Sequence, residues 1–370
     1  MFRLFSNSLI SLFFFFFFII ILSWPTCIPA RKTLGFALDN HVATVKSYNS
    51  TWYKSNIESF LNGSIGSQVI DISEIKKHLH RFGYFQLQND TFTDNTLDAR
   101  FESAVTLYQE KLGLPITGKL DFATVSQIFT PRCGMPDTTT IPIHTLHGTK
   151  HYVFFPGKPH WSRRMPMKLT YAFSQDYMIH NLTLSEIRVA FKRAFRRWAS
   201  VIPVSFTETD DYSFADIKIG FYYGDHGDGE PFDGVLGILA HSFSPESGRF
   251  HLDAAETWAV DFRKEKSAVA IDLESVATHE IGHLLGLAHS PVTEAVMYPS
   301  LKPRDQKLDL TLDDIEGVQA LYGSNPNFRF GSLLESDTST NQAVSLRNIR
   351  SYNVWVTLFL KLVLILCLCM

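Results

Sequence analysis

Hydrophobic residues in the first third of the chain recur at helical spacing. Within residues 98–114 the apolar positions are three or four apart, so they fall on one face of a helix. These positions are Phe101, Val105, Tyr108 and Leu112. Similar patterns occupy residues 72–85 and 119–129, and glycine and proline separate the three segments. The pattern predicts a small domain of three helices.

After residue 166 the pattern changes to the alternation that strands show. Apolar and polar residues alternate in the segments 168–173, 204–208 and 215–222. Between the first two lies an amphipathic helix, and Thr183 with Glu186 can form a capping box at its start. Its predicted buried stripe comprises Ile187, Ala190, Phe191, Ala194, Phe195 and Trp198.

Two further helices follow these strands. One covers about residues 273–285, and the last begins at Thr311 and ends at Gly323. Strands with helices first between them and then after them predict an α/β sandwich of one domain. Residues 136–166, rich in proline, threonine, histidine and glycine, connect it to the three-helix region. We see no internal repeat.

Apolar runs also occupy both ends of the chain. Residues 12–22 include six consecutive phenylalanines and lie between Arg3 and a stretch with small residues. This is the layout of a secretory signal peptide, which we place at residues 1–30 with cleavage near Ala30. A retained membrane anchor is the alternative, but the run is short for a bilayer crossing.

The C-terminal run, residues 354–370, is apolar apart from Lys361 and follows a polar stretch at 335–353. A small-residue site, a polar spacer and a terminal apolar tail form the layout of a glycolipid-anchor (GPI) signal, with attachment predicted at Asn341. The alternative is a short single-pass helix, although a spanning helix would normally continue into basic residues.

The composition indicates a secreted protein and leaves one cysteine without a partner. The chain has 370 residues, enough for two modest domains, and a net charge of -3 gives no reason to expect a nucleic acid partner. Three of its four cysteines, Cys27, Cys367 and Cys369, lie in the terminal segments, so processing leaves Cys133 alone. Such a thiol is an intermolecular bridge, a reactive liability or a metal ligand. Sequons predict N-glycosylation at Asn49, Asn62, Asn89 and Asn181.

Candidate chemistry is concentrated in the run HEIGHLLGLAH, late in the second helix of the sandwich. His279 and His283 are four residues apart, so they project from one helical face and can bind the same ion. Gly286 lets the chain leave the helix and bring His289 back as a third ligand. Three neutral nitrogens leave a fourth position for water, which is typical of catalytic zinc, and Glu280 is placed to act on that water.

A bare HExxH pattern arises by chance often enough to be a weak indication, so the longer pattern matters. Met297 follows the third histidine by eight residues in AVMYPS, a tight turn under the site. Together these features resemble the metzincin metalloproteases. A second motif, PRCGMPD at residues 131–137, resembles the cysteine switch of the matrix metalloproteinases, although Met135 stands where family members often carry Val or Asn. The resemblance extends over about residues 73–323.

This resemblance implies a latent proenzyme. A thiolate is a better zinc ligand than water, so Cys133 can fill the fourth position and block the activation of water. Arg132 and Asp137 are expected to pair and to hold the loop in the groove; the alternative is two solvated charges of small value. The role of an inhibitory zinc ligand accounts for the unpaired Cys133.

A second cluster precedes the catalytic helix. Three imidazoles and a carboxylate suit a closed tetrahedral zinc site, namely His226, Asp228, His241 and His251. Hard oxygens suit calcium: the carboxylates of Asp233, Asp253 and Glu256 and the carbonyls of Gly234, Leu236 and Ile238. Such a loop is more often a solvated turn, but its spacing resembles the structural zinc and calcium sites of the matrixins. A second calcium site is not expected, because Arg249 stands where an acid is needed.

The resulting hypothesis is zinc-assisted hydrolysis of internal peptide bonds, with Glu280 as the base that later protonates the leaving amine. The edge strand 237–241 can pair with an extended substrate. We expect substrate contacts from Leu239, Ala240, Ser275 and Pro299. Ser275 lies one turn before the first histidine, and its small size predicts a deep pocket for a large hydrophobic side chain just after the cleaved bond. The alternative is a serine that faces solvent or caps a helix turn.

The implied fold is a metzincin catalytic domain, a twisted mixed β-sheet with three helices, behind a three-helix prodomain of the peptidoglycan-binding type. The expected parts are a signal peptide at 1–30, a propeptide at 31–151, a catalytic domain at 152–323, a linker at 324–341 and a C-terminal signal at 342–370. As in plant-type matrixins, no hemopexin-like region is expected.

We expect a monomer on the outer face of the plasma membrane, held by a lipid anchor. Its partners would be extracellular protein substrates and an activating protease. Two alternatives remain. One is a zinc-containing extracellular binding module without turnover, against which an intact Glu280 beside an intact inhibitory cysteine argues. The other is a different metzincin branch, which lacks PRCGMPD at this position.

Overall fold

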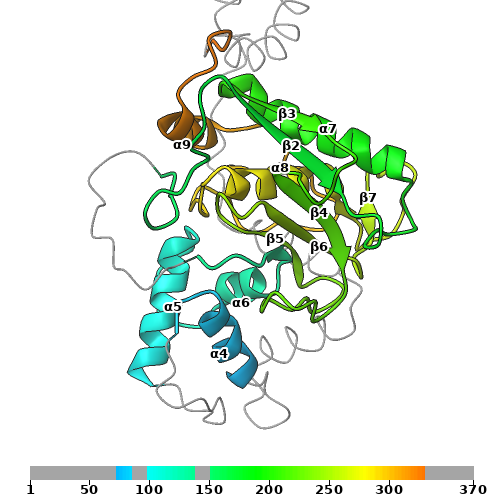
Figure 1. The fold of residues 1–370 in the computed structure, drawn as a ribbon. Coiled ribbons are helices and arrows are strands. Elements are labelled where there is room, and N and C mark those ends of the chain that lie inside the picture. The colour runs from blue at the N-terminus through cyan, green and yellow to red at the C-terminus, as the bar shows by residue number, and fades with distance from the viewer. Residues whose placement is uncertain (1–71, 86–97, 138–150, 330–370) are drawn as a thin grey trace, which may run out of the picture. The chain divides into compact units, whose positions relative to one another are not determined.

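The computed structural model describes residues 72–85, 98–137 and 151–329, and all of them belong to one compact unit that spans Ser47–Met370 (Figure 1). Both terminal apolar runs lie outside the described residues. So do four predicted modification sites, Asn49, Asn62, Asn89 and Asn341. Among the described residues, no helix has both the length and the apolar character needed to cross a membrane.

Three helices form the first part of the described chain: α4 (Ile72–Arg81), α5 (Ala99–Lys111) and α6 (Phe122–Ile128). Helices α5 and α6 begin at Asp98 and Asp121, whose carboxylates accept a hydrogen bond from the backbone N–H three residues later. The buried amide of Gln109 in α5 donates to the Lys119 carbonyl and to the Thr124 hydroxyl in α6. The predicted three-helix region is confirmed.

The rest of the chain is built on a mixed β-sheet. Its strands are β1 (Arg132–Cys133), β2 (Met167–Phe173), β3 (Val204–Glu208), β4 (Ile217–Tyr222), β5 (Ile238–Ser242) and β6 (Arg249–Asp253). Their order in space is β1-β5-β6-β4-β2-β3; β5 runs antiparallel to β6, and the other pairs are parallel. Strand β1 therefore covers the edge of β5. A separate parallel pair consists of β7 (Trp258–Ala259) and β8 (Ile271–Asp272).

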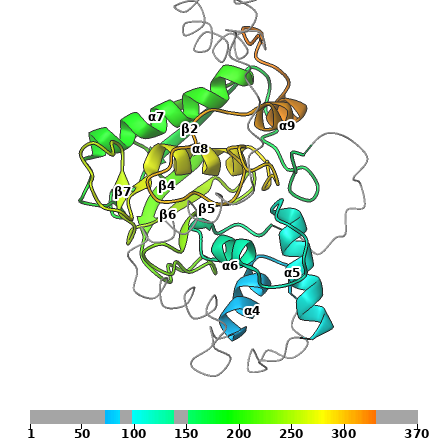
Figure 2. The same cartoon turned by 180° about the vertical axis from the view of Figure 1, so that it is seen from behind.

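Helices α7 (Leu184–Val201) and α8 (Leu273–Leu284) cover one face of this sheet. They lie behind the strands in Figure 1 and in front of them in Figure 2. The predicted capping box of Thr183 and Glu186 begins α7, and the predicted stripe of α7 is buried. Within this core, Trp198 donates its indole N–H to the Thr278 carbonyl of α8 at 2.8 Å. The last helix among the described residues is α9 (Leu312–Tyr322), so the predicted α/β fold is confirmed.

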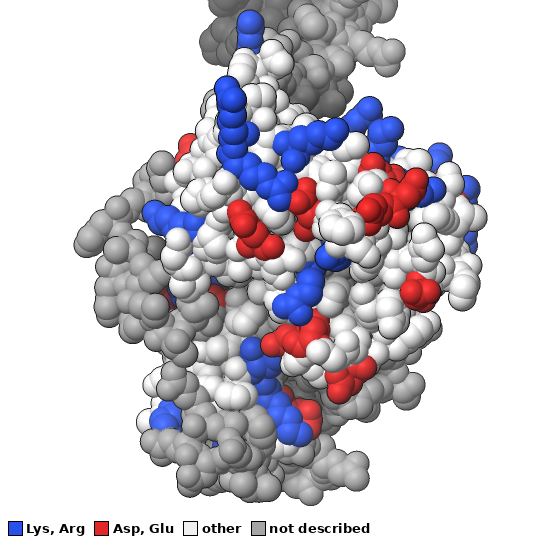
Figure 3. All heavy atoms as spheres, in the orientation of Figure 1, with Lys and Arg blue, Asp and Glu red and all other residues white. Residues whose placement is uncertain are grey.

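Charge also fixes the start of α8. Lys and Arg side chains gather over α7 in Figure 3, with acidic side chains near them. Arg193 and Arg197 of α7 both pair with Glu274 in the first turn of α8, and the carboxylate side chain of Glu274 is only 6% exposed. The helix dipole and the two guanidinium groups stabilise this buried charge. These contacts with α7 thus help to fix the orientation of α8 and of the residues later in it.

Candidate active site

Three imidazoles and a thiol meet at the end of α8. The Nε2 atom of His283 lies 3.1 Å from that of His279 and 3.2 Å from that of His289. The Sγ atom of Cys133, which is 150 residues earlier in the chain than His283, lies 3.3 Å from His283 Nε2. All four residues are buried, and their candidate ligand atoms lie within 4.8 Å of one another.

A glycine turn delivers the third histidine. Gly286 has a φ of +105°, which L residues rarely adopt, and a Cβ added there would lie 2.2 Å from the Pro159 carbonyl oxygen. No other residue fits this point without displacing backbone. The chain therefore reverses here and brings His289 to the two histidines of the helix, as the sequence predicted.

Backbone carbonyls orient the two helical histidines. His279 Nδ1 lies 2.7 Å from the Val296 carbonyl oxygen, and His283 Nδ1 lies 2.8 Å from that of Leu287. A carbonyl can only accept, so each Nδ1 carries the proton and donates it. The lone pair of each Nε2 is therefore free for a metal ion.

The predicted Met turn supports this arrangement from below. Met297 is buried, and a Cβ added to Gly282 of α8 would lie 2.2 Å from its sulfur. Asp314, buried at the start of α9, accepts hydrogen bonds from the N–H groups of Val296 and Met297, both at 3.0 Å. Sequence reasoning missed this role of Asp314. The only local signal was an acid in the first turn of a helix.

Burial sets the protonation states that a metal would meet. Desolvation, followed by repulsion between the imidazoles, lowers the pKa values of His279 and His283 well below the usual value, and burial also lowers that of His289. The imidazoles are therefore neutral, as ligands must be. Burial, with the nearby Glu280 carboxylate as the second cause, raises the pKa of Cys133. A cation here would reverse that shift, so three nitrogens and a sulfur fit zinc.

Glu280 projects into the same buried space. Neither of its carboxylate oxygens makes a conventional hydrogen bond, and its polar neighbours are the Cys133 thiol and the Ser242 hydroxyl. Burial raises the pKa of Glu280 to about 8. A buried carboxylate whose polar neighbours are one thiol and one hydroxyl, and whose pKa lies near neutrality, can both accept and return a proton.

The segment at residues 131–137 lies between two walls of the site and is hydrogen-bonded to both. In the parallel pairing of β1 with β5, Cys133 lies opposite Ala240, and the Gly134 N–H donates to the Ala240 carbonyl at 2.8 Å. On the other side, the Cys133 N–H donates to the Pro299 carbonyl at 2.8 Å. Two residues predicted to bind substrate, Ala240 and Pro299, are thus engaged by the chain's own backbone.

The predicted pair of Arg132 and Asp137 is confirmed and is more buried than a solvated pair. Nη2 of Arg132 lies 2.6 Å from Oδ1 of Asp137, and both side chains are 3% exposed. The same Oδ1 lies 2.6 Å from His289 Nδ1, and Oδ2 accepts a hydrogen bond from the Tyr84 hydroxyl at 2.6 Å. Sequence reasoning missed the contacts with His289 and Tyr84, because no local pattern links residues 152 and 53 positions apart.

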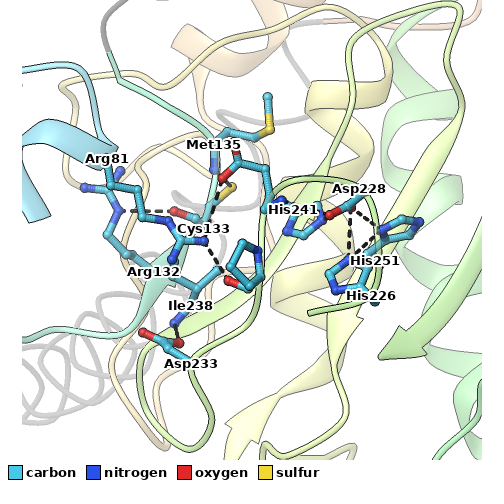
Figure 4. A network of polar contacts seen from close by, with 12 residues as sticks. Arg81, Arg132, Cys133, Met135, His226, Asp228, Asp233, Ile238, His241 and His251 are labelled. Atoms are coloured by element: carbon cyan, nitrogen blue, oxygen red, sulfur yellow. Dashed lines mark hydrogen bonds and ion pairs between the residues drawn. The ribbon is translucent and has the colours of Figure 1, made fainter. Parts of the chain in front are cut away.

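The second predicted metal cluster is also brought together (Figure 4). Oδ2 of Asp228 lies 2.9 Å from His226 Nε2, 2.8 Å from His241 Nε2 and 2.8 Å from His251 Nδ1. Desolvation lowers the pKa values of His241 and His251 to about 4 although Asp228 opposes the shift, so both imidazoles are neutral. Three imidazole nitrogens and a carboxylate fit a tetrahedral zinc ion.

The predicted calcium residues come from two neighbouring segments, one leading into β5 and one at the end of β6. Burial, with repulsion from Asp253 and Asp233 as a further cause, raises the pKa of Glu256 to about 8, and Oε2 of Glu256 is buried without a partner. Three crowded carboxylates fit a divalent cation with oxygen ligands. These carboxylates accept hydrogen bonds from the N–H groups of Gly234, Leu236 and Ile238 at 3.1, 2.7 and 2.7 Å. The contacts seen for these three residues are thus through their N–H groups, whereas the prediction concerned their carbonyls.

A cavity opens beside the histidines and Glu280. Its lining includes the predicted residues Leu239, Ser275 and Pro299. The Ser275 hydroxyl turns into the wall, where it donates to Oδ2 of Asp272 at 2.6 Å and accepts from the Lys307 N–H at 2.8 Å. The Ser275 hydroxyl is therefore bound to Asp272, the N-cap residue of α8, and what Ser275 gives the cavity is its small size.

Asn181 is the one predicted glycosylation site that falls among the described residues. Its residue is exposed, and the hydroxyl-bearing member of its sequon, Thr183, is the N-cap of α7. The side-chain amide of Asn181 donates weakly to the Trp258 carbonyl at 3.4 Å. The exposure is compatible with a modified asparagine.

Comparisons with known proteins agree with this geometry. Residues 160–323 match the family model described as Matrixin, and residues 69–128 match a putative peptidoglycan binding domain. The chain is 60% identical over 277 residues to metalloendoproteinase 4-MMP of Arabidopsis thaliana, covering 75% of this chain and 80% of that protein. It is 57% identical over 293 residues to 1-MMP of the same plant, covering 79% of each. Human matrix metalloproteinase-20 is 39% identical over 224 residues, 60% of this chain and 42% of that protein.

Proposed function

The chain belongs to the matrixin family of metalloendopeptidases, which use zinc and calcium, and from this premise we propose that it is made as a zymogen whose propeptide closes the active site. One observation carries the proposal. The Cys133 thiol lies against the histidine nitrogens while the backbone around it pairs with both walls of the site. A segment placed in this way excludes water and substrate together.

We assign His279, His283 and His289 as ligands of the catalytic zinc, with Cys133 as the fourth ligand in the latent form. When bound, zinc supplies Lewis acidity, which polarises a carbonyl oxygen and acidifies a nearby water. Glu280 takes the proton of this water as it attacks the peptide carbonyl and delivers it to the departing amine. The unengaged, buried carboxylate of Glu280 supports both steps.

The second cluster is assigned to a structural zinc, with all four positions filled by protein. Its ligands are His226, Asp228, His241 and His251. The crowded carboxylates of Asp233, Asp253 and Glu256 hold calcium, completed by the carbonyls of Gly234, Leu236 and Ile238. Because both ions take ligands from the segment that leads into β5, they stabilise the strand on which substrate is expected to lie.

The substrate is an extracellular protein in an extended conformation. Strand β5 is an edge strand once β1 leaves, and its backbone groups at Leu239 and Ala240 can then pair with a substrate. The cavity lined by Ser275 and Pro299 receives the side chain just after the cleaved bond. A large aliphatic or aromatic side chain is favoured there, because its burial removes apolar surface from water.

Latency is tested by Cys133→Ser in the full proprotein. A hydroxyl is a poor zinc ligand, so this variant should cleave a quenched peptide substrate without losing residues 31–151. The matched control is Ser126→Ala, on α6 and away from the thiol, which should stay latent. A Cys133→Ser proprotein that is inert until its propeptide is cut would contradict the thiol lock.

We also propose that the mature chain is secreted and held on the outer face of the plasma membrane by a lipid on Asn341. The apolar runs at 12–22 and 354–370, together with the exposed Asn181 sequon, support this route. Treatment of cells with phosphatidylinositol-specific phospholipase should release the protein. Retention, with residues 354–370 still detectable by mass spectrometry, would favour a spanning helix instead.

A further inference from the structure

The three histidines of the catalytic cluster do not obtain their orientation from the same source. His279 and His283 each face a backbone carbonyl of the catalytic domain through Nδ1. His289 faces no such carbonyl. Its Nδ1 lies 2.6 Å from Oδ1 of Asp137, which belongs to the propeptide. Two histidines are therefore oriented permanently, and the third by a segment that activation removes.

The carboxylate of Asp137 is itself held firmly. Oδ1 also accepts from Arg132 at 2.6 Å, and Oδ2 accepts from the Tyr84 hydroxyl at 2.6 Å. The side chains of Asp137, Arg132 and His289 are each 3% exposed, so water does not compete for these contacts. A carboxylate with this many donors has one orientation available, and that orientation presents Oδ1 to the imidazole.

We propose that Asp137 is a positioning residue for the catalytic zinc, which makes the propeptide part of the metal site in two ways. By accepting the Nδ1–H of His289, Asp137 holds the tautomer whose Nε2 lone pair faces the other histidines. A carboxylate partner also raises the basicity of a histidine ligand. The thiol of Cys133 blocks the site, while the carboxylate of Asp137 strengthens the hold on zinc. This inference rests on the proposed role of His289 as a zinc ligand.

A consequence follows for activation. Cleavage removes the thiol and the carboxylate together, because residues 131–137 leave as one segment. The mature enzyme then holds its catalytic zinc through two histidines with fixed partners and one whose Nδ1 faces solvent. The zymogen is therefore the form that retains zinc best, and the structural zinc, whose ligands all lie within the catalytic domain, should be indifferent to cleavage.

The test measures zinc release from the zinc-loaded, full-length proprotein into an excess of the chelator 4-(2-pyridylazo)resorcinol. Loss of an outer partner of a metal-ligating histidine lowers metal affinity by roughly 10- to 100-fold. Asp137→Asn should therefore release one zinc faster by about this factor. The second, structural zinc should be released at an unchanged rate. Because Asp137→Asn leaves a buried guanidinium unpaired, the double variant Arg132→Met with Asp137→Asn is measured beside it.

The matched control is Gln127→Ala. This change removes a contact of the propeptide with the catalytic domain, the 2.7 Å hydrogen bond from Gln127 to the Ser300 hydroxyl, without touching a histidine. Release from Gln127→Ala should match the unaltered protein. If Gln127→Ala accelerates release as much as Asp137→Asn does, the effect is one of loosened docking and the inference is wrong.

A spectroscopic readout needs no substitution in the propeptide. In protein labelled with ¹⁵N-histidine, the Nδ1–H of His289 should exchange slowly with solvent before cleavage and quickly after it, while those of His279 and His283 stay slow. Slow exchange of all three after cleavage would overturn the inference. The proposed function fails separately: His289→Ala that still binds both zinc ions would show that His289 is not a ligand at all.

Discussion

Two clusters of four candidate metal ligands lie among the described residues, and they differ in where the fourth candidate ligand comes from. Around Asp228, the three histidines and the carboxylate come from one stretch in which His226 and His251 are 25 residues apart. Around His283, the fourth ligand is a cysteine 150 residues away, on a separate segment. The comparison suggests a rule: a fourth ligand from the same stretch of chain suits a site that stabilises the fold, and one from a separate segment suits the switch that we propose.

The carboxylate at each cluster also differs in how far other groups engage it. Oδ2 of Asp228 is engaged by three imidazoles, so no acid beside that cluster is left to handle a proton. Beside the catalytic cluster, both oxygens of Glu280 are buried without a conventional hydrogen bond. The carboxylate of Asp228 is thus fully engaged, as suits a structural site, whereas that of Glu280 is left available for proton transfer.

The largest expected effect is a loss of activity on substitution of Glu280, the acid beside the catalytic cluster. Glu280→Ala in the activated enzyme should lower kcat by about 10²- to 10⁴-fold, because water loses its base, while both zinc ions stay bound. Peptide cleavage and zinc content by mass spectrometry measure the two quantities. The exposed Glu294→Ala is the control and should behave as the unaltered enzyme does. A fully loaded Glu280→Ala enzyme of normal rate would remove this residue from the mechanism.

The next effect concerns the closed cluster. Asp228→Ala leaves three buried imidazoles without their carboxylate, and the loss of one partner of a buried charged network costs about 3–5 kcal/mol. For a domain of this size that corresponds to a fall in Tm of roughly 10 °C, measurable by calorimetry. Asp225→Ala, an exposed neighbour on the same loop, should cost little. Well below the transition, kcat should change far less than in Glu280→Ala; an equal loss of kcat would mean that the two clusters do not divide the work as assigned.

The smallest effect sharpens the comparison at the cavity beside the catalytic cluster. Ser275→Arg should fill this cavity and remove the preference for the largest side chains after the cleaved bond, a change of about 1–3 kcal/mol in relative kcat/KM. Ser275→Ala is the matched control: it loses the hydrogen bonds to Asp272 and Lys307 but stays small, so specificity should be kept. Peptide-library profiling that finds Ser275→Arg unchanged would show that the loop at residues 299–310 sets the depth instead.

Local patterns in the sequence predicted the elements well, because their causes are local. The capping box of Thr183 and Glu186 is a contact across three residues, and the pairing of His279 with His283 follows from helical spacing alone. The turn at Gly286 was predictable because only glycine tolerates its backbone conformation. The predicted helices and strands therefore begin and end close to the observed ones, whereas β1, β6, β7 and β8 had no predicted counterpart.

Contacts between distant segments were beyond the reach of such patterns. The sequence paired Asp137 with its near neighbour Arg132, but gave no sign that the same oxygen would meet His289. The hydrogen bonds from the Met turn to Asp314 likewise depend on how α9 docks. The sequence thus identified which groups do the chemistry, and the tertiary structure identified which groups hold them.

The pairing of β1 with β5 has a consequence for the mature protein if activation removes β1, as we propose. Removing it leaves β5 as an unpaired edge, a row of N–H and C=O groups that any extended chain can join, including a loop of a second copy. The exposed edge of β5 that binds a substrate therefore also lets each activated molecule be cleaved by another copy or associate with it. In the six-stranded form β1 covers this edge and so protects the protein from self-cleavage and association. Crowding on a surface would increase both in the five-stranded form.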